Sequence, residues 1–126
     1  MKKICYGFVL LAIIANITNA HELTPTYPKL KPSVIDGVLM AEMKLWNRRR
    51  DVRYYEITVH DSEWNNIPFA AVERLMNVEY NEMRIFGVYV KKETARRITY
   101  ICTTSKQLKE DVESTGLTTR ICSKVK

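Results

Sequence analysis

The first twenty residues constrain this chain most, because they read as a secretory signal peptide. Its charged start is Lys2 and Lys3, and its apolar run extends from Tyr6 to Ile14. Thr18 and Ala20 supply the small residues of a cleavage site. The apolar run is well short of the roughly 20 residues that a membrane-spanning helix needs. We therefore expect residues 1–20 to be removed, and the remainder to be a secreted or periplasmic protein with no integral membrane segment.

Cleavage would also decide the size of the protein and the state of its cysteines. Removing 20 of the 126 residues leaves 106, which is enough for one domain with a single modest core. Cys5 would leave with the leader, so Cys102 and Cys122 remain, and an even pair in an oxidising compartment predicts one disulfide. A metal-binding or reactive pair is the alternative, but there is no CxxC spacing and no histidine near either cysteine.

The formal charge of +6 becomes +4 without Lys2 and Lys3, since the leader contains no acidic residue. A mildly basic secreted protein indicates an acidic protein partner or an anionic component of the cell envelope, and it points away from nucleic acid. Solubility alone explains the same charge equally well.

Two stretches have the apolar spacing of amphipathic helices. The first is predicted from Val34 to Arg48 behind a capping box of Ser33 and Asp36, and the second from Pro68 to Met83. Their apolar stripes are Ile35, Leu39, Met43 and Trp46 in the first, and Phe69, Val72, Met76, Tyr80 and Met83 in the second. A third, short helix is predicted between Ser105 and Gly116.

Four stretches favour β-strands. Val52 to His60 alternates with period two, and Ile85 to Val90, Arg97 to Thr104 and Thr118 to Ser123 are rich in β-branched and aromatic residues. Because the connection between the middle two is short, we expect those two strands to pair as an antiparallel hairpin.

Together these elements predict a single small α+β domain over residues 33–126. We expect a mainly antiparallel sheet of about four strands, with two longer helices and one short helix packed on it, and one disulfide. Residues 21–32 contain Pro25, Pro28 and Pro32, which prevent regular helix and favour an extended proline-containing arm in front of the domain.

The strongest candidate for a binding surface is a basic and aromatic patch. Arginine guanidinium groups grip carboxylates and phosphates in pairs, and arginine with tyrosine or tryptophan is typical of protein interfaces. The residues assigned to this partner-binding patch are Arg48, Arg49, Arg50, Arg53, Tyr54 and Trp64. The alternative interpretation is that the arginines only cap the end of the first predicted helix.

A copper site is a second possibility. If the leader is cut after Ala20, His21 becomes the amino terminus, and its amine and imidazole could chelate one copper ion, with His60 completing the ligand set. No other cofactor is indicated. An exposed terminus and a histidine at a strand edge would account for the same two residues without metal.

Enzymatic chemistry receives less support from the sequence. A small secreted hydrolase could use Glu56, His60 and Asp61 as acid and base, but the usual nucleophile motifs and phosphate-binding glycine loops are absent. We therefore expect a small non-enzymatic binding protein, such as an accessory, inhibitor or immunity-type factor, that recognises a protein or an anionic envelope partner.

Overall fold

The computed structural model describes residues 20–107 and 118–126. Within them the regular structure is almost entirely β, and the one helical element is a three-residue 3-10 turn, Ala95–Arg97. The strands are β1 (Glu22–Thr24), β2 (Lys31–Pro32), β3 (Val38–Trp46), β4 (Tyr54–His60), β5 (Leu75–Asn77), β6 (Met83–Lys91), β7 (Tyr100–Lys106) and β8 (Arg120–Lys124).

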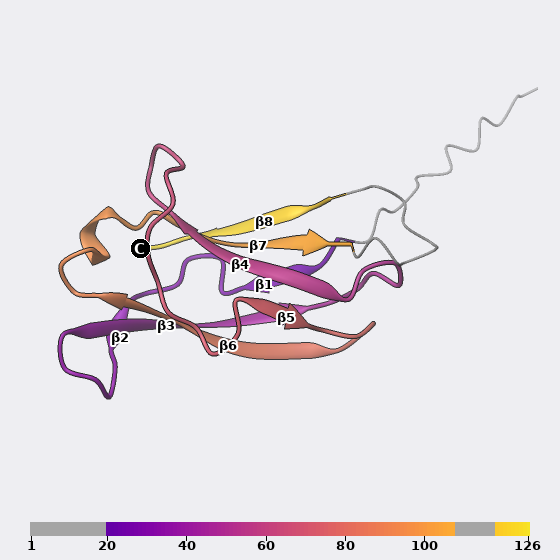
Figure 1. Ribbon diagram of the computed structural model, residues 1–126, viewed down its shortest axis with the longest axis horizontal. Helices are drawn as coiled ribbons and strands as arrows, with labels where there is room; N and C mark the ends of the chain where they lie inside the picture. Colours follow the sequence, from indigo (N-terminus) through magenta and orange to yellow (C-terminus); the bar gives the residue numbers. More distant parts are fainter. Residues whose placement is uncertain (1–19, 108–117) are drawn as a thin grey trace, which may run out of the picture.

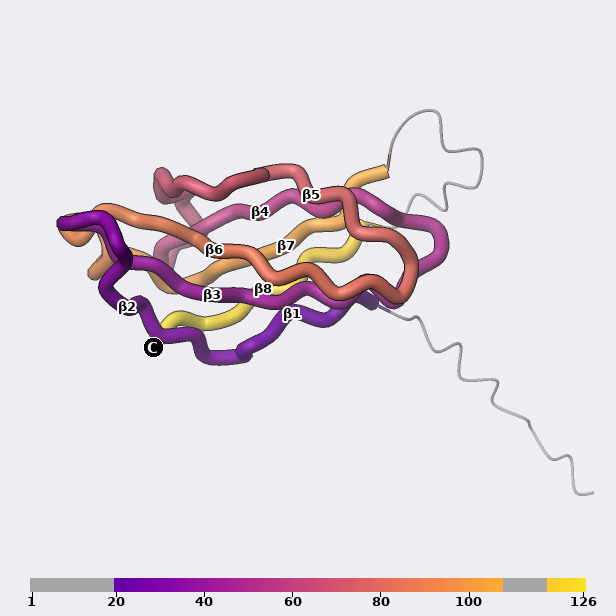
Figure 2. The backbone as a smooth tube through the Cα atoms, turned by 90° about the horizontal axis from the view of Figure 1, so that it is seen from below, coloured from indigo at the N-terminus to yellow at the C-terminus, as the bar shows by residue number. Residues whose placement is uncertain are grey.

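The strands form two antiparallel sheets. In sheet A, β3 pairs along one edge with β1 and β2 in turn, and along its other edge with β6 (Figure 1). In sheet B the strand order is β5-β4-β7-β8. Figure 2 shows β3 and β6 running side by side, and β4 beside β7 in the second layer.

The core lies between the two sheets, and strand alternation decides which side chains enter it. In β3 the buried residues Ala41, Met43 and Leu45 alternate with exposed Glu42 and Lys44. Sheet B contributes a matching set from its inner face, Tyr55, Ile57, Val59, Ile101 and Thr103. This period-two burial is what a face-to-face β sandwich requires.

The segment 21–32, expected as an extended arm, contains β1 and β2 and lies against the sandwich. His21 and Leu23 are buried in it. Farther along, the backbone N–H groups of Lys124 and Lys126 donate to the carbonyls of Thr26 and Pro28 at 3.0 Å each. The segment therefore joins β8 to sheet A and closes this side of the sandwich.

The predicted α+β class is wrong, because neither longer helix forms. The stretch 34–48 forms a turn followed by β3, so its buried residues follow a period of two instead of the helical stripe. The stretch 68–83 forms an irregular crossing, β5 and a turn, and Val72 from its predicted stripe is 95% exposed. The short helix predicted after Ser105 falls mainly on residues 108–117, outside the described residues, while Ser105 itself lies in β7.

All four predicted strands are present as β4, β6, β7 and β8, with shifted ends. The hairpin expected between the middle two is wrong, because β6 pairs with β3 whereas β7 pairs with β4 and β8. The connection between them crosses from one sheet to the other. The predicted disulfide is present: Cys102 and Cys122 face each other on β7 and β8.

No helix among the residues that the structure describes is long and apolar enough to cross a bilayer.

Candidate functional site

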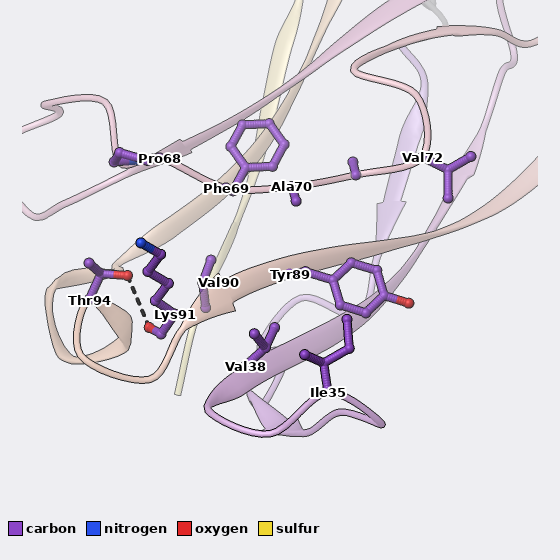
Figure 3. A pocket seen from close by; sticks show the side chains of 11 residues that line it. Ile35, Val38, Pro68, Phe69, Ala70, Val72, Tyr89, Val90, Lys91 and Thr94 are labelled. Carbon is purple, nitrogen blue, oxygen red and sulfur yellow. Dashed lines mark hydrogen bonds between the residues drawn. The ribbon is translucent and has the colours of Figure 1, made fainter.

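An open, largely apolar groove of about 640 Å³ lies beside the end of β6. This is within the usual size range of ligand and side-chain pockets. Its lining comes from the turn before β3, the segment 68–72 and the end of β6, and consists of Ile35, Val38, Pro68, Phe69, Ala70, Ala71, Val72, Tyr89, Val90, Lys91 and Thr94 (Figure 3). We call these residues the apolar groove.

One rim of the groove is set by the tight β2–β3 connection. Ser33 Oγ accepts from the Ile35 N–H at 3.1 Å and donates to the Val38 carbonyl at 2.7 Å, while Gly37 adopts a φ of +75° that disfavours other residues. These contacts hold Ile35 at the rim, where its side chain is 56% exposed. The apolar side chain is therefore held in place while it remains open to solvent.

The opposite rim is a segment that leaves sheet B, touches sheet A and returns. The Ile67 N–H bonds to Val59 on β4, and Ala70 then exchanges two backbone hydrogen bonds with Tyr89 on β6, at 2.8 and 2.9 Å. Arg74 donates to the Phe69 carbonyl at 2.6 Å and lies 4.8 Å from the centre of its ring. This arrangement presents Phe69 and Val72 to the groove.

The groove has a charged side chain at one end only. Lys91 is the single charged residue in the lining, and it forms no ion pair within residues 20–107 and 118–126. Figure 3 shows its side chain extending beside Thr94, whose hydroxyl donates to the Lys91 carbonyl at 3.0 Å. The groove thus suits an apolar group that carries a negative charge at one end.

The structure divides the predicted basic and aromatic patch. Arg48, Arg50 and Arg53 lie over the rings of Trp46, Tyr80 and Tyr54, at 4.9, 4.4 and 5.7 Å respectively. Arg48 also pairs with Glu22 at 2.9 Å. Each of these three arginines is therefore stacked on an aromatic ring, near the end of the sandwich where β3 ends and β4 begins.

Arg49 does not belong to this group of stacked arginines, because it is buried. Its guanidinium pairs with Asp51 through two hydrogen bonds and also approaches Ser105 and Thr119, at 3.4 and 3.3 Å. Such a buried pair costs stability if either partner is removed. We assign Arg49 a structural role.

Trp64 lies at the opposite end of β4 from Tyr54. Its ring stacks on Tyr100 at 4.2 Å, and Arg120 covers its other side at 4.8 Å. Trp64 therefore packs over the outer face of sheet B, separate from the three stacked arginines.

His21 is enclosed between the sheets, with 1% of its surface exposed. Its Nε2 atom lies 2.8 Å from Thr103 Oγ1, and its ring lies 4.6 Å from that of Tyr55. Burial lowers the pKa of His21 to about 4, a charge effect from Arg49 acts in the same direction, and the hydrogen bond to Thr103 opposes them. Burial likewise raises the pKa of Tyr55.

The two histidines proposed for copper do not meet. His21 packs with Tyr55 on the inner face of sheet B, whereas His60 points to the outer face, 2.9 Å from Thr58 Oγ1 and beside Trp64. No group of three His, Cys, Asp or Glu residues able to hold a metal ion is found among the described residues. The ring nitrogens of His21 face threonine hydroxyls.

The three residues of the hydrolase hypothesis also remain apart. Glu56 and His60 lie on one strand face but four residues apart, which separates them by about 13 Å, and Glu56 pairs with Lys106 at 3.1 Å. The Asp61 carboxylate accepts from the N–H groups of Asn65 and Glu63 in the following turn, and these bonds lower its pKa. Asp61 therefore organises the turn.

The groove was missed by the sequence reasoning because both of its rims were assigned to helices. Ile35 and Val72 were placed on helical stripes that face a core, whereas the structure leaves both exposed. Gly37 interrupts the first of these stretches, and it is the signal that could have indicated a turn and an exposed rim there.

Sequence comparisons do not identify relatives: no family model matches, and no curated protein matches. Among solved structures, the chain is similar to the ASH / PapD-like domain of human CEP192 (PapD-like domain 7), with a TM-score of 0.54 and 8% identity over 94% of each chain. At that identity the likeness concerns the fold alone. The protein therefore has an immunoglobulin-like, PapD-like β fold.

Proposed function

We propose that this chain is a secreted, non-enzymatic protein-binding domain, and that the apolar groove is its main contact site. The observation that carries the proposal is the pair of exposed rims, since Ile35 and Val72 both line the groove and both stay open to solvent. Contiguous exposed apolar surface on a soluble domain is typical of an interaction site. Lys91 at one end favours a partner segment with an acidic residue next to its apolar side chains.

Secretion is supported by two independent features. The leader of residues 1–20 has the composition of a signal peptide, and Cys102 and Cys122 form a disulfide, which persists in oxidising compartments. Intact-mass measurement of protein recovered from the native host tests the first feature, because cleavage after Ala20 predicts a chain that begins with His21. Recovery of the uncleaved chain in the cytoplasm would contradict secretion.

The three stacked arginines form a second candidate contact for an anionic partner. Their guanidinium groups lie on the rings of Trp46, Tyr80 and Tyr54, a combination that is enriched at protein interfaces. The positive charge of Arg48 is already paired with the exposed carboxylate of Glu22. We therefore rank this surface below the groove.

The experiment is a capture of partners from the native envelope fraction with four proteins: wild type, Ile35→Asp, Val34→Asp, and the alanine triple variant of Arg48, Arg50 and Arg53. Val34 is a matched control, because it is exposed in the same loop but does not line the groove. We expect Ile35→Asp to weaken binding of the captured partner at least tenfold, about 1.4 kcal/mol, and Val34→Asp to leave it unchanged. Loss of binding in the arginine variant alone would move the site to the second surface.

A further inference from the structure

We propose that two copies of this protein associate through the free edge of β6, with Ile85 on the two-fold axis. In an antiparallel pair, every second residue of a strand directs its N–H and C=O groups toward the neighbouring strand. The Asn47 N–H bonds to the Glu82 carbonyl just before β6, so in β6 the even-numbered residues are the ones that face β3. The odd-numbered residues point the other way, and Tyr89 uses both its groups to bind Ala70. In the described part of the chain, no backbone hydrogen bond reaches the outward groups of Ile85 or Gly87.

The path of the chain explains why this edge is free. Among the described residues, the segment after β4 forms a backbone bridge with β6 only at Ala70 and then returns to sheet B, where β5 pairs with β4. The remaining edge borders a smaller cavity of about 240 Å³, whose lining includes Val72, Met76, Ile85 and Gly87. The edge of Met83–Gly87 is thus left without a neighbouring strand.

The Met83–Gly87 edge carries only one of the features that usually prevent strand association. Sheet edges are commonly protected by lysine, proline or inward-pointing charges. Here Met83 and Ile85 are 58% and 64% exposed, and the sequence from Ile85 to Val90 carries no charge. The protecting feature is Arg84, which pairs in register with the buried Leu45 and therefore points inward; its guanidinium is paired with Glu73 at 3.0 Å.

These properties favour a second copy as the occupant. An uncharged apolar edge with alternating free N–H and C=O groups complements an identical antiparallel edge. Pairing about Ile85 would place Met83 opposite Gly87 of the partner subunit, where the partner subunit's Tyr89 ring lies over the glycine and would contact the methionine side chain. Because Arg84 is neutralised within its own subunit, the two copies can approach without like-charge repulsion at the contact.

The dimer would have a defined consequence for the apolar groove. A two-fold axis through an antiparallel strand pair is perpendicular to the sheet, so the outer faces of both A sheets would lie on the same side. The assembly would therefore present two grooves toward one surface and could bind a repeated partner bivalently. Dimerisation itself does not depend on what the groove binds.

The first test is sedimentation equilibrium between about 1 and 100 µM. We expect a monomer–dimer equilibrium for the wild type and at least a tenfold weaker association for Ile85→Pro. Proline at position 85 removes an outward N–H and leaves the ladder to β3, made by Arg84 and Phe86, intact. Ile85→Thr is the matched control, because it retains the N–H and the β-branched shape and should still dimerise.

A cross-linking test is independent of proline effects on folding. In the proposed register the two copies of residue 85 face each other as a hydrogen-bonded pair, with Cα atoms about 5.5 Å apart, within the range of a disulfide. Ile85→Cys should therefore form a covalent dimer on mild oxidation. Met83→Cys should not, because its two copies would be about 13 Å apart.

Three results would overturn the proposal. They are a wild-type chain that stays monomeric at 100 µM, a dimer that is insensitive to Ile85→Pro, or equal cross-linking at positions 83 and 85. A monomeric wild type would leave the edge available to an extended segment of another protein. Because Ile35→Asp alters the groove and leaves the edge unchanged, failure of the dimer and failure of groove binding are separable.

Discussion

The burial of His21 predicts that the protein loses stability on mild acidification. Its imidazole is 1% exposed, and its pKa is about 4 in the folded protein against an ordinary value of 6.5. Between these two pH values the unfolded chain binds a proton at His21 and the folded protein does not. Stability from this residue is therefore fully present above pH 6.5 and is lost as the pH falls toward 4.

The size of the effect follows from the shift in pKa. Each unit corresponds to 1.36 kcal/mol, so the change from 6.5 to about 4 represents about 3 kcal/mol. This is a large share of the roughly 5–15 kcal/mol that stabilises a typical domain. His21→Gln removes the titration while retaining a side chain that can hydrogen-bond to Thr103.

The assay is urea unfolding of the wild type and His21→Gln at a series of pH values from 7 to 4, followed by circular dichroism. Carboxylates also titrate in this range, but they contribute equally to both proteins, so the difference in unfolding free energy isolates His21. We expect the advantage of the wild type to shrink by about 3 kcal/mol between pH 6.5 and 4. His60→Gln, on the opposite sheet face, should keep the acid-dependent loss. If the difference in unfolding free energy between the wild type and His21→Gln stays constant with pH, His21 is not the source of the acid sensitivity.

Three other predictions concern stability. Asn47→Ala should lower the free energy of unfolding by about 3 kcal/mol or more, as measured by chemical unfolding. The reason is that the buried Asn47 amide donates to the Val52 and Val78 carbonyls at 2.6 and 2.8 Å and accepts from the Tyr55 hydroxyl. Tyr55→Phe should cost only about 1 kcal/mol, since Asn47 Oδ1 still accepts from the Arg49 N–H, and an equal cost for both variants would argue against this account. Thiol labelling should find neither Cys102 nor Cys122 free before reduction, and reduction should cost roughly 3 kcal/mol for the loop that they close.

Strands β4, β6, β7 and β8 were recognisable in the sequence because their signals are local. Val52 to His60 alternates with period two and contains β-branched and aromatic residues, so no other element suits it. The disulfide was equally accessible, because the predicted leader removes Cys5 and leaves one possible pair.

The helices were predicted wrongly because one sequence satisfies two periods. From Leu39 to Leu45, apolar residues stand at every second position, yet Ile35, Leu39, Met43 and Trp46 also fit a helical stripe. The decision depends on the partner strands: β1, β2 and β6 all pair with β3, and the pairings with β1 and β6 join residues far apart in the sequence. Local propensity is a weak term beside such tertiary pairing.

The candidate site could not be predicted from local sequence patterns either, because it too depends on long-range contacts. Ile35, Val72 and Tyr89 meet at one groove only because the segment after β4 crosses to β6 and returns. His21 is a second case. Its position near the proposed cleavage site predicts an exposed terminus, but the pairing of β1 with β3 places it between the sheets, against Thr103 of β7.

The sequence by itself determined the positions of β4, β6, β7 and β8, the single possible disulfide and the expectation of export, since each depends on residue type, spacing or count within a short stretch. Only the tertiary structure decided the β sandwich, the division of the arginine patch, the open edge of β6 and the apolar groove. The physical reason is that a strand, unlike a helix, completes its hydrogen bonds with other segments. Which residues are covered, and which remain free to bind, is therefore settled by strand pairing over long distances in the chain.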